Sequence, residues 1–184
     1  MNKMNSSSIY FREMEERDWS DVHEYASVEK VSLHQPWGPN SLAESQEFVR
    51  QSIVDANVLP RTRFVFAIVA AESDKMIGAG EMNIRDLTNK EGELGYIVNP
   101  DYWGRGIAPE VARLVIQFGF EKLNLHRIYA TCAPQNIGSQ KVLEKIGMVR
   151  EGRLRENLLL KEGWRDSLIY SVLQHEWEKN CLNG

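Results

Sequence analysis

The chain has 184 residues, of which 42% are hydrophobic and 26% are charged, and its formal net charge is −4. These values are typical of a soluble globular domain, since a chain of this size can bury roughly 70% of its unfolded surface. No apolar run approaches the roughly 20 residues of a transmembrane helix, so no membrane partner is expected. The negative charge argues against a broad nucleic-acid surface and is compatible with small cationic substrates. The chain shows no apolar secretion signal, and Cys132 and Cys181 suggest no disulfide framework, so we expect a cytoplasmic protein.

The first third of the chain is expected to be mainly helical. Residues 1–8 are polar and serine-rich, which predicts a flexible tail before a single domain over residues 9–178. Ser41 is followed three residues later by Glu44, and this capping box predicts the start of a helix. The elements expected in this part are a strand near residues 9–14, a helix near 18–28, a proline-containing loop at 34–40 and a helix from Ser41 to about residue 56.

The middle of the chain has the pattern of three consecutive strands. Residues 64–70 (FVFAIVA) are continuously apolar, and residues 76–84 follow after a polar turn, which predicts a hairpin with a buried first strand. A third strand ends before Pro100. Its side chains alternate between two faces, with Leu94, Tyr96 and Val98 on one face and Glu93, Gly95 and Ile97 on the other.

The last part of the chain alternates between helices and strands. Apolar residues at positions 111, 114, 115 and 118 predict an amphipathic helix, and Pro109 suits its first turn. Gly147 is expected to stop a later helix. The further elements are a strand at 127–132, this helix at 136–146, and two strands near 149–155 and 165–173. The order of elements predicts a mixed α/β fold.

The segment YWGRGIAPE, residues 102–110, lies at the corner between the third strand of this middle region and the following helix. The first amides of a helix have no intrahelical partners and carry partial positive charge, so they can bind an anion. Gly104 and Gly106 let the backbone approach such an anion closely, and Arg105 adds a positive charge. The alternative is a glycine-rich turn that only connects two elements.

Two familiar phosphate-binding loops do not fit this corner. A dinucleotide fingerprint requires a third glycine at position 109, where Pro109 stands. The lysine and the serine or threonine of a nucleoside-triphosphate loop are also missing. The expected anion therefore belongs to another kind of ligand.

Two motifs carry a resemblance to the GNAT acetyltransferases. YIVNPDYWGRGIA, residues 96–108, resembles the acyl-CoA pyrophosphate loop of that family, whose motif is Gln/Arg-x-x-Gly-x-Gly/Ala. Gly106 and Ala108 take the last two places, and Trp103 stands where the motif has Gln or Arg. CAPQNIGSQKVLEKIGM, residues 132–148, resembles the second motif of the branch that contains ribosomal-protein N-terminal (alanine/serine) acetyltransferases. The similarity extends over residues 9–173.

The resemblance implies the GNAT fold, a mixed and mostly antiparallel central sheet of about seven strands. The sheet is expected to be splayed between its fourth and fifth strands and flanked by about four helices. Acetyl-CoA, as co-substrate, is expected in this opening, and Gly95 is expected to mark an irregularity there or simply to pack closely. The implied cofactor contacts are Ile97 and Val98 for the pantetheine arm, Asn136, and the unpaired amides of Trp103, Gly104, Arg105, Gly106, Ile107 and Ala108 for the diphosphate.

The resemblance also implies roles for two residues of the second motif. Asn136 is expected to cap its helix and to touch the cofactor arm. Ser139 faces inward with the apolar stripe of the same helix, and the family role is to give a proton to the departing thiolate. The alternative is a hydroxyl that bonds only to its own helix or to a neighbour.

The implied reaction is direct attack of an amine on the thioester through a tetrahedral intermediate, which requires a base. Glu93 is the first candidate and Glu156 the second, and either could act through a water; each could also be a solvated surface carboxylate. Thr131 offers no base. Four scattered histidines indicate no metal site, and Cys132 is expected to be buried packing.

The acceptor is expected to be a primary amine, for example a protein N-terminus such as that of a ribosomal protein. A polyamine, an antibiotic amine or an amino acid is the alternative acceptor. A non-catalytic acyl-CoA-binding module and an interaction protein without a cofactor are the other classes. Trp37 either lines the acceptor mouth or covers the edge of the core, and the protein is expected to be a monomer or a homodimer.

Overall fold

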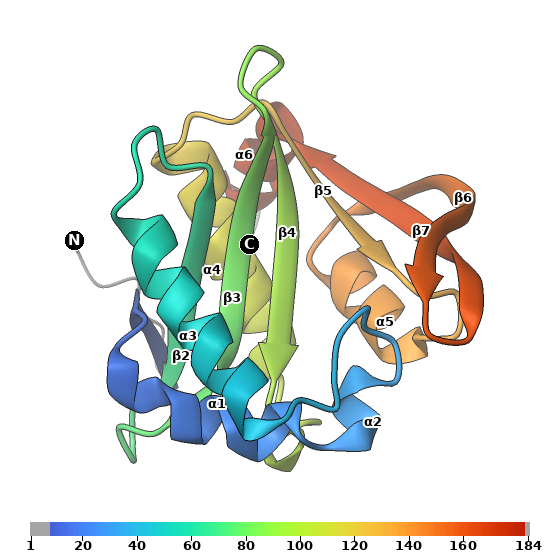
Figure 1. Cartoon of the computed structure of the whole chain (residues 1–184). Helices are drawn as coiled ribbons and strands as arrows, with labels where there is room; N and C mark the ends of the chain where they lie inside the picture. Colours follow the sequence, from blue (N-terminus) through green and yellow to red (C-terminus); the bar gives the residue numbers. More distant parts are fainter. Residues whose placement is uncertain (1–7, 183–184) are drawn as a thin grey trace.

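A computed structural model describes residues 8–182 and shows one seven-stranded sheet (Figure 1). The expected tail at residues 1–8 lies almost entirely outside these residues. The strand order is β1-β2-β3-β4-β5-β7-β6, and all neighbours are antiparallel except β4 and β5. The strands are β1 (Ile9–Glu13), β2 (Arg63–Ala70), β3 (Met76–Asp86), β4 (Glu91–Val98), β5 (Arg127–Cys132), β6 (Val149–Leu160) and β7 (Gly163–Leu173).

The sheet opens between β4 and β5, as predicted. These two strands pair only between residues 91–93 and 127–129, and β4 then turns away from β5 (Figure 1). The expected irregularity at Gly95 is wrong, because Gly95 pairs in regular register with Glu81 of β3. The register shift between β3 and β4 instead lies between Ile84 and Asp86, near the hairpin turn. The opening therefore results from lost pairing with β5, not from a bulge in β4.

Helices cover both faces of the sheet. The capping box is confirmed, since the Ser41 amide donates to Glu44 Oε2 (2.7 Å) and the Glu44 amide donates to Ser41 Oγ (3.3 Å). The short helix at Glu29–Ser32 and the final helix were missed by the sequence analysis. The helices are α1 (Trp19–Ala26), α2 (Glu29–Ser32), α3 (Leu42–Ala56), α4 (Ile107–Glu121), α5 (Ile137–Lys145) and α6 (Gln174–Leu182), with short 3-10 turns η1 (Glu16–Asp18) and η2 (Pro100–Tyr102).

The core has two layers, one on each side of β2 and β3. On one side α4 packs the fully buried Val111 and Val115 against the sheet, and Phe118 meets Phe66 edge to face at 5.0 Å. On the other side α1 and α3 bury Tyr25 and Val49. Because β2 is covered on both faces, its sequence is continuously apolar and not alternating. Burying each such large side chain contributes about 1.5–3 kcal/mol.

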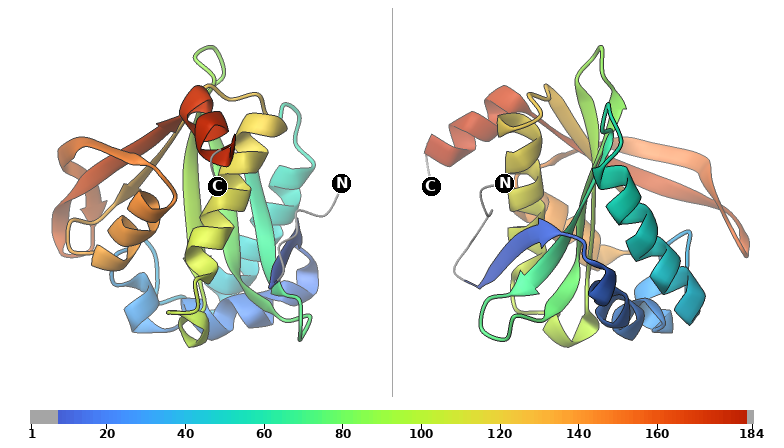
Figure 2. Two further views of the ribbon diagram at one scale, coloured as in Figure 1. Left: turned by 180° about the vertical axis from the view of Figure 1, so that it is seen from behind. Right: turned by 60° about the vertical axis from the view of Figure 1, so that its left-hand side comes forward.

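The hairpin of β6 and β7 projects away from the rest of the sheet (Figure 2). Both strands are longer than predicted, and the register shifts between Leu154 and Leu158 around Glu156, whose φ is +47°. This bulge interrupts the alternation of side chains, so the outer half of the hairpin has no clear strand signal. None of the helices in residues 8–182 has the length and apolarity needed to span a bilayer.

Candidate active site

The turn between β4 and α4 is anchored to two other elements by Asn99. This buried residue donates its amide to Ile77 O of β3 (2.8 Å), and its side chain donates to Glu24 Oε1 of α1 (3.0 Å). Its side-chain oxygen accepts the amide of Asp101 (3.0 Å), which starts the 3-10 turn before the corner. The corner that follows is therefore held in a fixed position at the end of β4.

The corner presents unpaired amides in a left-handed backbone. Gly104 and Gly106 have φ of +76° and +80°, a conformation that costs other residues about 1–2 kcal/mol. A Cβ added at either glycine would meet no atom within 4 Å, so the space in front of the backbone is open. The amides of residues 104–106 donate to no carbonyl in the described turn and cap contacts, and the first-turn amides of Ile107 and Ala108 lack intrahelical partners.

Trp103 was expected to contribute an unpaired amide, but its amide is bonded. Its amide donates to Pro100 O (3.1 Å), so the group of unpaired amides begins at Gly104 and not at Trp103. Its indole Nε1 donates to Val98 O (2.8 Å), which ties the corner to the end of β4. The ring is half exposed, and the ammonium of Lys30 lies 5.7 Å from its centre. The tryptophan at the first place of the motif thus holds the corner against β4 through its side chain.

A cavity of about 730 Å³, the corner cavity, lies between β4, the corner and α5. Arg105 does not line it; its guanidinium lies 5.1 Å from the centre of the Tyr102 ring. The other predicted cofactor residues are brought together here. The corner cavity is lined by Ile97, Val98, Trp103, Gly104, Gly106, Ile107, Ala108, Asn136 and Ser139, together with Tyr96, Gln35 and ten other residues.

Two residues of α5 and one of β4 meet across the open part of the sheet. Asn136 caps α5, as predicted, because its Oδ1 accepts the amide of Ser139 (3.0 Å). The Oγ of Ser139 lies 3.1 Å from the hydroxyl of Tyr96, and this bond joins α5 to β4. Burial raises the pKa of Tyr96 to about 12, so the phenol is neutral at physiological pH. Ser139 therefore has a partner outside its own helix.

Tyr96 was assigned to a strand face in the sequence analysis but was given no role. The available signal was its hydroxyl on an otherwise apolar face, which requires a hydrogen-bond partner when buried. Cys132, by contrast, is buried in the core as expected, and burial raises the pKa of its thiol.

A second cavity of about 920 Å³, the α3 cavity, lies on the side of α1 and α3. Gln35, Tyr96 and Ile97 line both cavities, so the two meet at the open end of β4. Trp37 packs against the core, which confirms the second interpretation of this residue, and it also lines the α3 cavity. The lining includes Tyr25, Phe48, Gly95, Glu44, Glu47, Glu81, Arg63 and Lys161.

The loop between the two cavities is held by the β6–β7 hairpin. Arg165 of β7 donates from Nη1 to His34 O (2.5 Å), and Lys161 at the hairpin turn lies 3.5 Å from Gly38 O. Burial and the positive charge of Arg165 lower the pKa of His34, which lines the corner cavity. The hairpin therefore fixes the position of Gln35 at the junction.

The structure does not bring the two candidate bases into either cavity. The carboxylate of Glu93 pairs with Arg85 (2.6 Å) and lines neither cavity. Glu156 is exposed on the bulge of β6, where its amide donates to Asp166 Oδ1 (2.8 Å). Glu44, Glu47 and Glu81, the carboxylates in the α3 cavity, were missed. The described residues 8–182 contain no group of three or more His, Cys, Asp or Glu suited to a metal ion.

The amide-lined cavity and the second cavity meet near the end of β4, beside the opening of the sheet, and together have room for two ligands. Residues 8–149 match the family model described as the acetyltransferase (GNAT) domain. The chain therefore belongs to the GNAT acetyltransferase family, and it is an N-acetyltransferase that uses acetyl-CoA. The open space at Gly104 and Gly106 and the unpaired amides fit the diphosphate of this co-substrate.

Named relatives and a solved structure agree with this assignment. The chain is 33% identical over 169 residues (92% of this chain, 95% of the relative) to the uncharacterized N-acetyltransferase YnaD of Bacillus subtilis. It is 36% identical over 93 residues (50% and 51%) to YdaF of the same organism, provisionally named a ribosomal N-acetyltransferase, and 25% identical over 173 residues (92% and 88%) to Escherichia coli spermidine N(1)-acetyltransferase. A GNAT acetyltransferase structure from Bacillus anthracis has a TM-score of 0.83 at 29% identity and covers 95% of this chain and 99% of that chain.

Proposed function

We propose that the protein acetylates a primary amine that enters the α3 cavity, and that this amine is a protein N-terminus such as that of a ribosomal protein. The single observation that supports this arrangement is the junction of the two cavities at Tyr96 and Ile97. One cavity has the donors for acetyl-CoA, and the other has room for an acceptor. In this proposal the enzyme acts in the cytoplasm, where acetyl-CoA and the acceptor are both present.

Residues of the corner cavity hold the co-substrate in this proposal. The amides of residues 104–108 bind the diphosphate, and the backbone of Ile97 and Val98 lies beside the pantetheine arm. Asn136 at the start of α5 contacts the same arm. Arg105 contributes its charge at the rim, because it does not line the cavity. When bound, acetyl-CoA supplies an acetyl group activated as a thioester.

Ser139 is proposed as the proton donor. Its Oγ is held by Tyr96 at 3.1 Å at the place where the two cavities meet, so it can release a proton toward a sulfur and regain one from the phenol side. Glu93 keeps its proposed role as base only through intervening water, because Arg85 occupies its carboxylate and neither cavity reaches it. Glu156 likewise keeps its proposed role only through intervening water, because it lines neither cavity.

The dimensions of the α3 cavity support a peptide-like acceptor. At about 920 Å³ it exceeds what a single amino group needs, and its aromatic lining suits the first side chain of a peptide. The name of YdaF points to ribosomal substrates. The polyamine alternative has its own support in the carboxylates Glu44 and Glu81, and in the name of the spermidine acetyltransferase.

The test is an acetylation panel. Peptides that begin with Ala or Ser, the same peptides with blocked N-termini, spermidine, and an aminoglycoside are mixed with acetyl-CoA, and free thiol is followed. We expect kcat/KM for an unblocked peptide to exceed that for spermidine by about tenfold or more, equivalent to about 1.4 kcal/mol. A higher value for spermidine would replace the peptide acceptor by a polyamine. Stabilisation by acetyl-CoA, about 2.7 kcal/mol at 100 times its Kd, tests cofactor binding separately.

A further inference from the structure

The α3 cavity contains a carboxylate whose two oxygens have different surroundings. Glu81 lies on β3, directly opposite Gly95 of β4, and it lines the cavity. Its Oε1 accepts two hydrogen bonds, from Arg63 Nε and from Asn83 Nδ2, both at 2.8 Å. Among the hydrogen bonds of residues 8–182, none goes to its Oε2. One oxygen therefore fixes the carboxylate, and the other keeps its capacity to accept.

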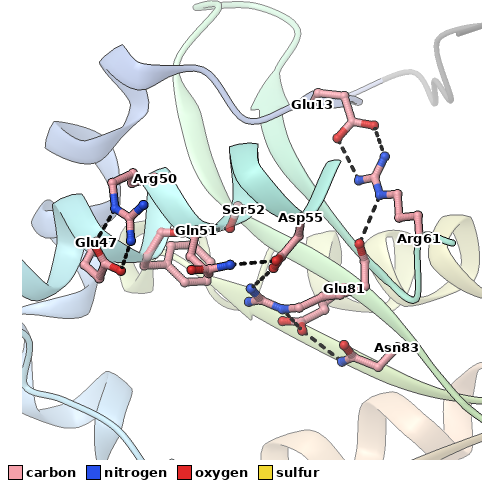
Figure 3. Close-up of polar contacts among 11 residues, drawn as sticks. Glu13, Glu47, Arg50, Gln51, Ser52, Asp55, Arg61, Glu81 and Asn83 are labelled. Carbon is pink, nitrogen blue, oxygen red and sulfur yellow. Dashed lines mark hydrogen bonds and ion pairs between the residues drawn. The ribbon is translucent and has the colours of Figure 1, made fainter. Parts of the chain in front are cut away.

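The charges around Glu81 leave one negative charge without a partner. Arg63 is shared between two carboxylates, since it also pairs with Asp55 of α3 (2.7 Å). The neighbouring Arg61 does not supply the missing charge, because both of its terminal nitrogens bind Glu13 (2.8 and 2.9 Å; Figure 3). The side chain of Glu81 is about one-quarter exposed, which limits screening by solvent. This part of the cavity wall therefore favours a cation.

Glu47 offers a contrast within the same cavity. It also lines the α3 cavity, but both of its oxygens bind Arg50 one turn along α3 (Figure 3). Its charge is compensated and its acceptor capacity is used. Glu47 and Glu81 thus differ, because only Glu81 of these two keeps an oxygen without a hydrogen bond. The third carboxylate of the cavity, Glu44, also keeps one, but it is exposed at the start of α3, its Oε2 binds the amide and the hydroxyl of Ser41, and the charge of Lys161 acts on it.

Gly95 keeps the space over Glu81 open. A Cβ added at Gly95 would make only one contact, with Cβ of Glu81 at 3.5 Å. A longer side chain at this cross-strand position would therefore lie over the carboxylate. The next residue of β4 is Tyr96, which reaches Ser139 at the junction of the cavities. Because Gly95 and Tyr96 point to opposite faces of β4, a group bound at Glu81 lies on the α3 side of the strand, and it approaches the corner cavity where the two cavities meet at Tyr96 and Ile97.

We propose that Glu81 binds the acceptor amine, with Oε2 accepting an N–H hydrogen bond from the ammonium group and Arg63 and Asn83 holding the carboxylate in place. This inference rests on the proposed function, because it identifies the group of the α3 cavity that recognises the acceptor. A peptide N-terminus and a polyamine present the same ammonium chemistry at this point. Glu81 thus provides recognition of the amine, and Ser139 serves the other substrate.

The test measures amine binding without turnover. The wild-type protein is saturated with CoA, and spermidine and a hexapeptide beginning with Ser are titrated separately by calorimetry. We expect Glu81→Gln to weaken the binding of the preferred amine about tenfold or more, since a hydrogen bond to a charged group is lost. Glu81→Asp keeps the charge and should lie between the two. Glu47→Gln, the matched control, should stay within about twofold of the wild type.

The outcomes separate this inference from the proposed function. If Glu81→Gln binds the amine as tightly as the wild type while CoA still raises its melting temperature, the inference is overturned. Failure of both probes to bind the wild-type protein also overturns it. If the wild type binds an amine through Glu81 but acetylates none, the proposed function fails and the binding site stands. The probe that binds more tightly, the peptide or spermidine, identifies the source of the amine.

Discussion

The corner cavity and the α3 cavity meet at β4, but they are built in different ways. The corner cavity owes its main feature to backbone, namely the unpaired amides of Gly104, Gly106, Ile107 and Ala108 within one short segment. The α3 cavity is lined mainly by side chains from α1, α3, β3, β4 and the loop at residues 35–40. A backbone site depends on conformation at a few positions, whereas a side-chain site depends on the identity of many separate residues. The first is suited to the shared co-substrate and the second to a particular acceptor.

This difference predicts how substitutions act. A change in the corner cavity should affect every acceptor equally, because all of them react with the same acetyl-CoA. A change in the α3 cavity should alter the ranking of acceptors and leave cofactor binding unchanged. Tyr96 belongs to both cavities, so its substitution should show both kinds of effect.

Ser139→Ala gives the largest expected effect. Loss of a positioned proton donor should lower kcat about 100-fold for every acceptor, while the Kd for acetyl-CoA changes little. Assays of thiol release with the preferred peptide and with spermidine measure kcat, and calorimetry with acetyl-CoA measures its Kd. The amide of Ser139 keeps its bond to Asn136 in this variant, so the helix cap is preserved. A variant that retains more than half of the wild-type kcat would remove Ser139 from the reaction.

Gly106→Val should act on binding. At φ +80° a branched side chain is strained by about 1–2 kcal/mol, and the Cβ enters the open space in front of the amides. We expect the Kd for acetyl-CoA to rise by about 10- to 100-fold, measured by calorimetry. Gly163→Val is the matched control, because Gly163 also has positive φ (+123°) and open space but lies at the β6–β7 turn. Both variants should melt earlier, and equal affinities in the two would contradict an anion site at Gly106.

The sequence predicted the corner cavity better than the α3 cavity for a physical reason. The glycines, Pro109 and the strand before them lie within one short segment, so local rules of conformation identify the corner. The role of Glu81 depends on its register with Gly95 and on Arg63, which lies 18 residues away. Such contacts exist only after the sheet has formed, and no local pattern contains them.

The difference between local patterns and tertiary contacts also explains which elements and roles were predicted correctly. The helix α4 was predicted because its buried residues repeat with helical spacing. The helix α6 is mostly polar, and Trp177 is its member packed against the core, so its sequence shows no apolar stripe. Glu93 was chosen as base from its place on β4, but the preference of its carboxylate for Arg85 is a tertiary contact. A local pattern was thus sufficient for α4, whereas α6 and Glu93 depend on contacts that form only in the folded chain.

Tyr96→Phe tests the junction and has a smaller effect on the reaction. Loss of the bond to Ser139 should lower kcat by about three- to tenfold, as expected for one hydrogen bond. The pH dependence of stability gives an independent readout. Burial raises the pKa of Tyr96 to about 12, so the fold favours the neutral phenol.

This stabilisation is complete below pH 10, where the unfolded tyrosine is also neutral, and it is lost as the pH rises toward 12. The unfolding free energy of the wild type, relative to Tyr96→Phe, should therefore fall by about 2–3 kcal/mol over this range. Urea unfolding at several pH values measures the difference. Tyr25, whose pKa is also raised by burial, is present in both proteins and cancels. A constant difference from pH 9 to 12 would show that Tyr96 is not buried in this way.

Lys161→Met should give the smallest effect. It should improve the KM for the acceptor, whereas the other substitutions weaken cofactor binding or turnover. Lys161 places a positive charge on the rim of the α3 cavity, where it repels a cationic amine. Its removal should lower the KM for the acceptor by about twofold at low salt, and the change should vanish above roughly 0.5 M salt because rim charges are screened. Lys122→Met, at the far end of α4, is the control for a general change in net charge. A rise in KM at low salt would mean that Lys161 holds the acceptor or the loop at Gly38, and that the cavity does not select for positive charge.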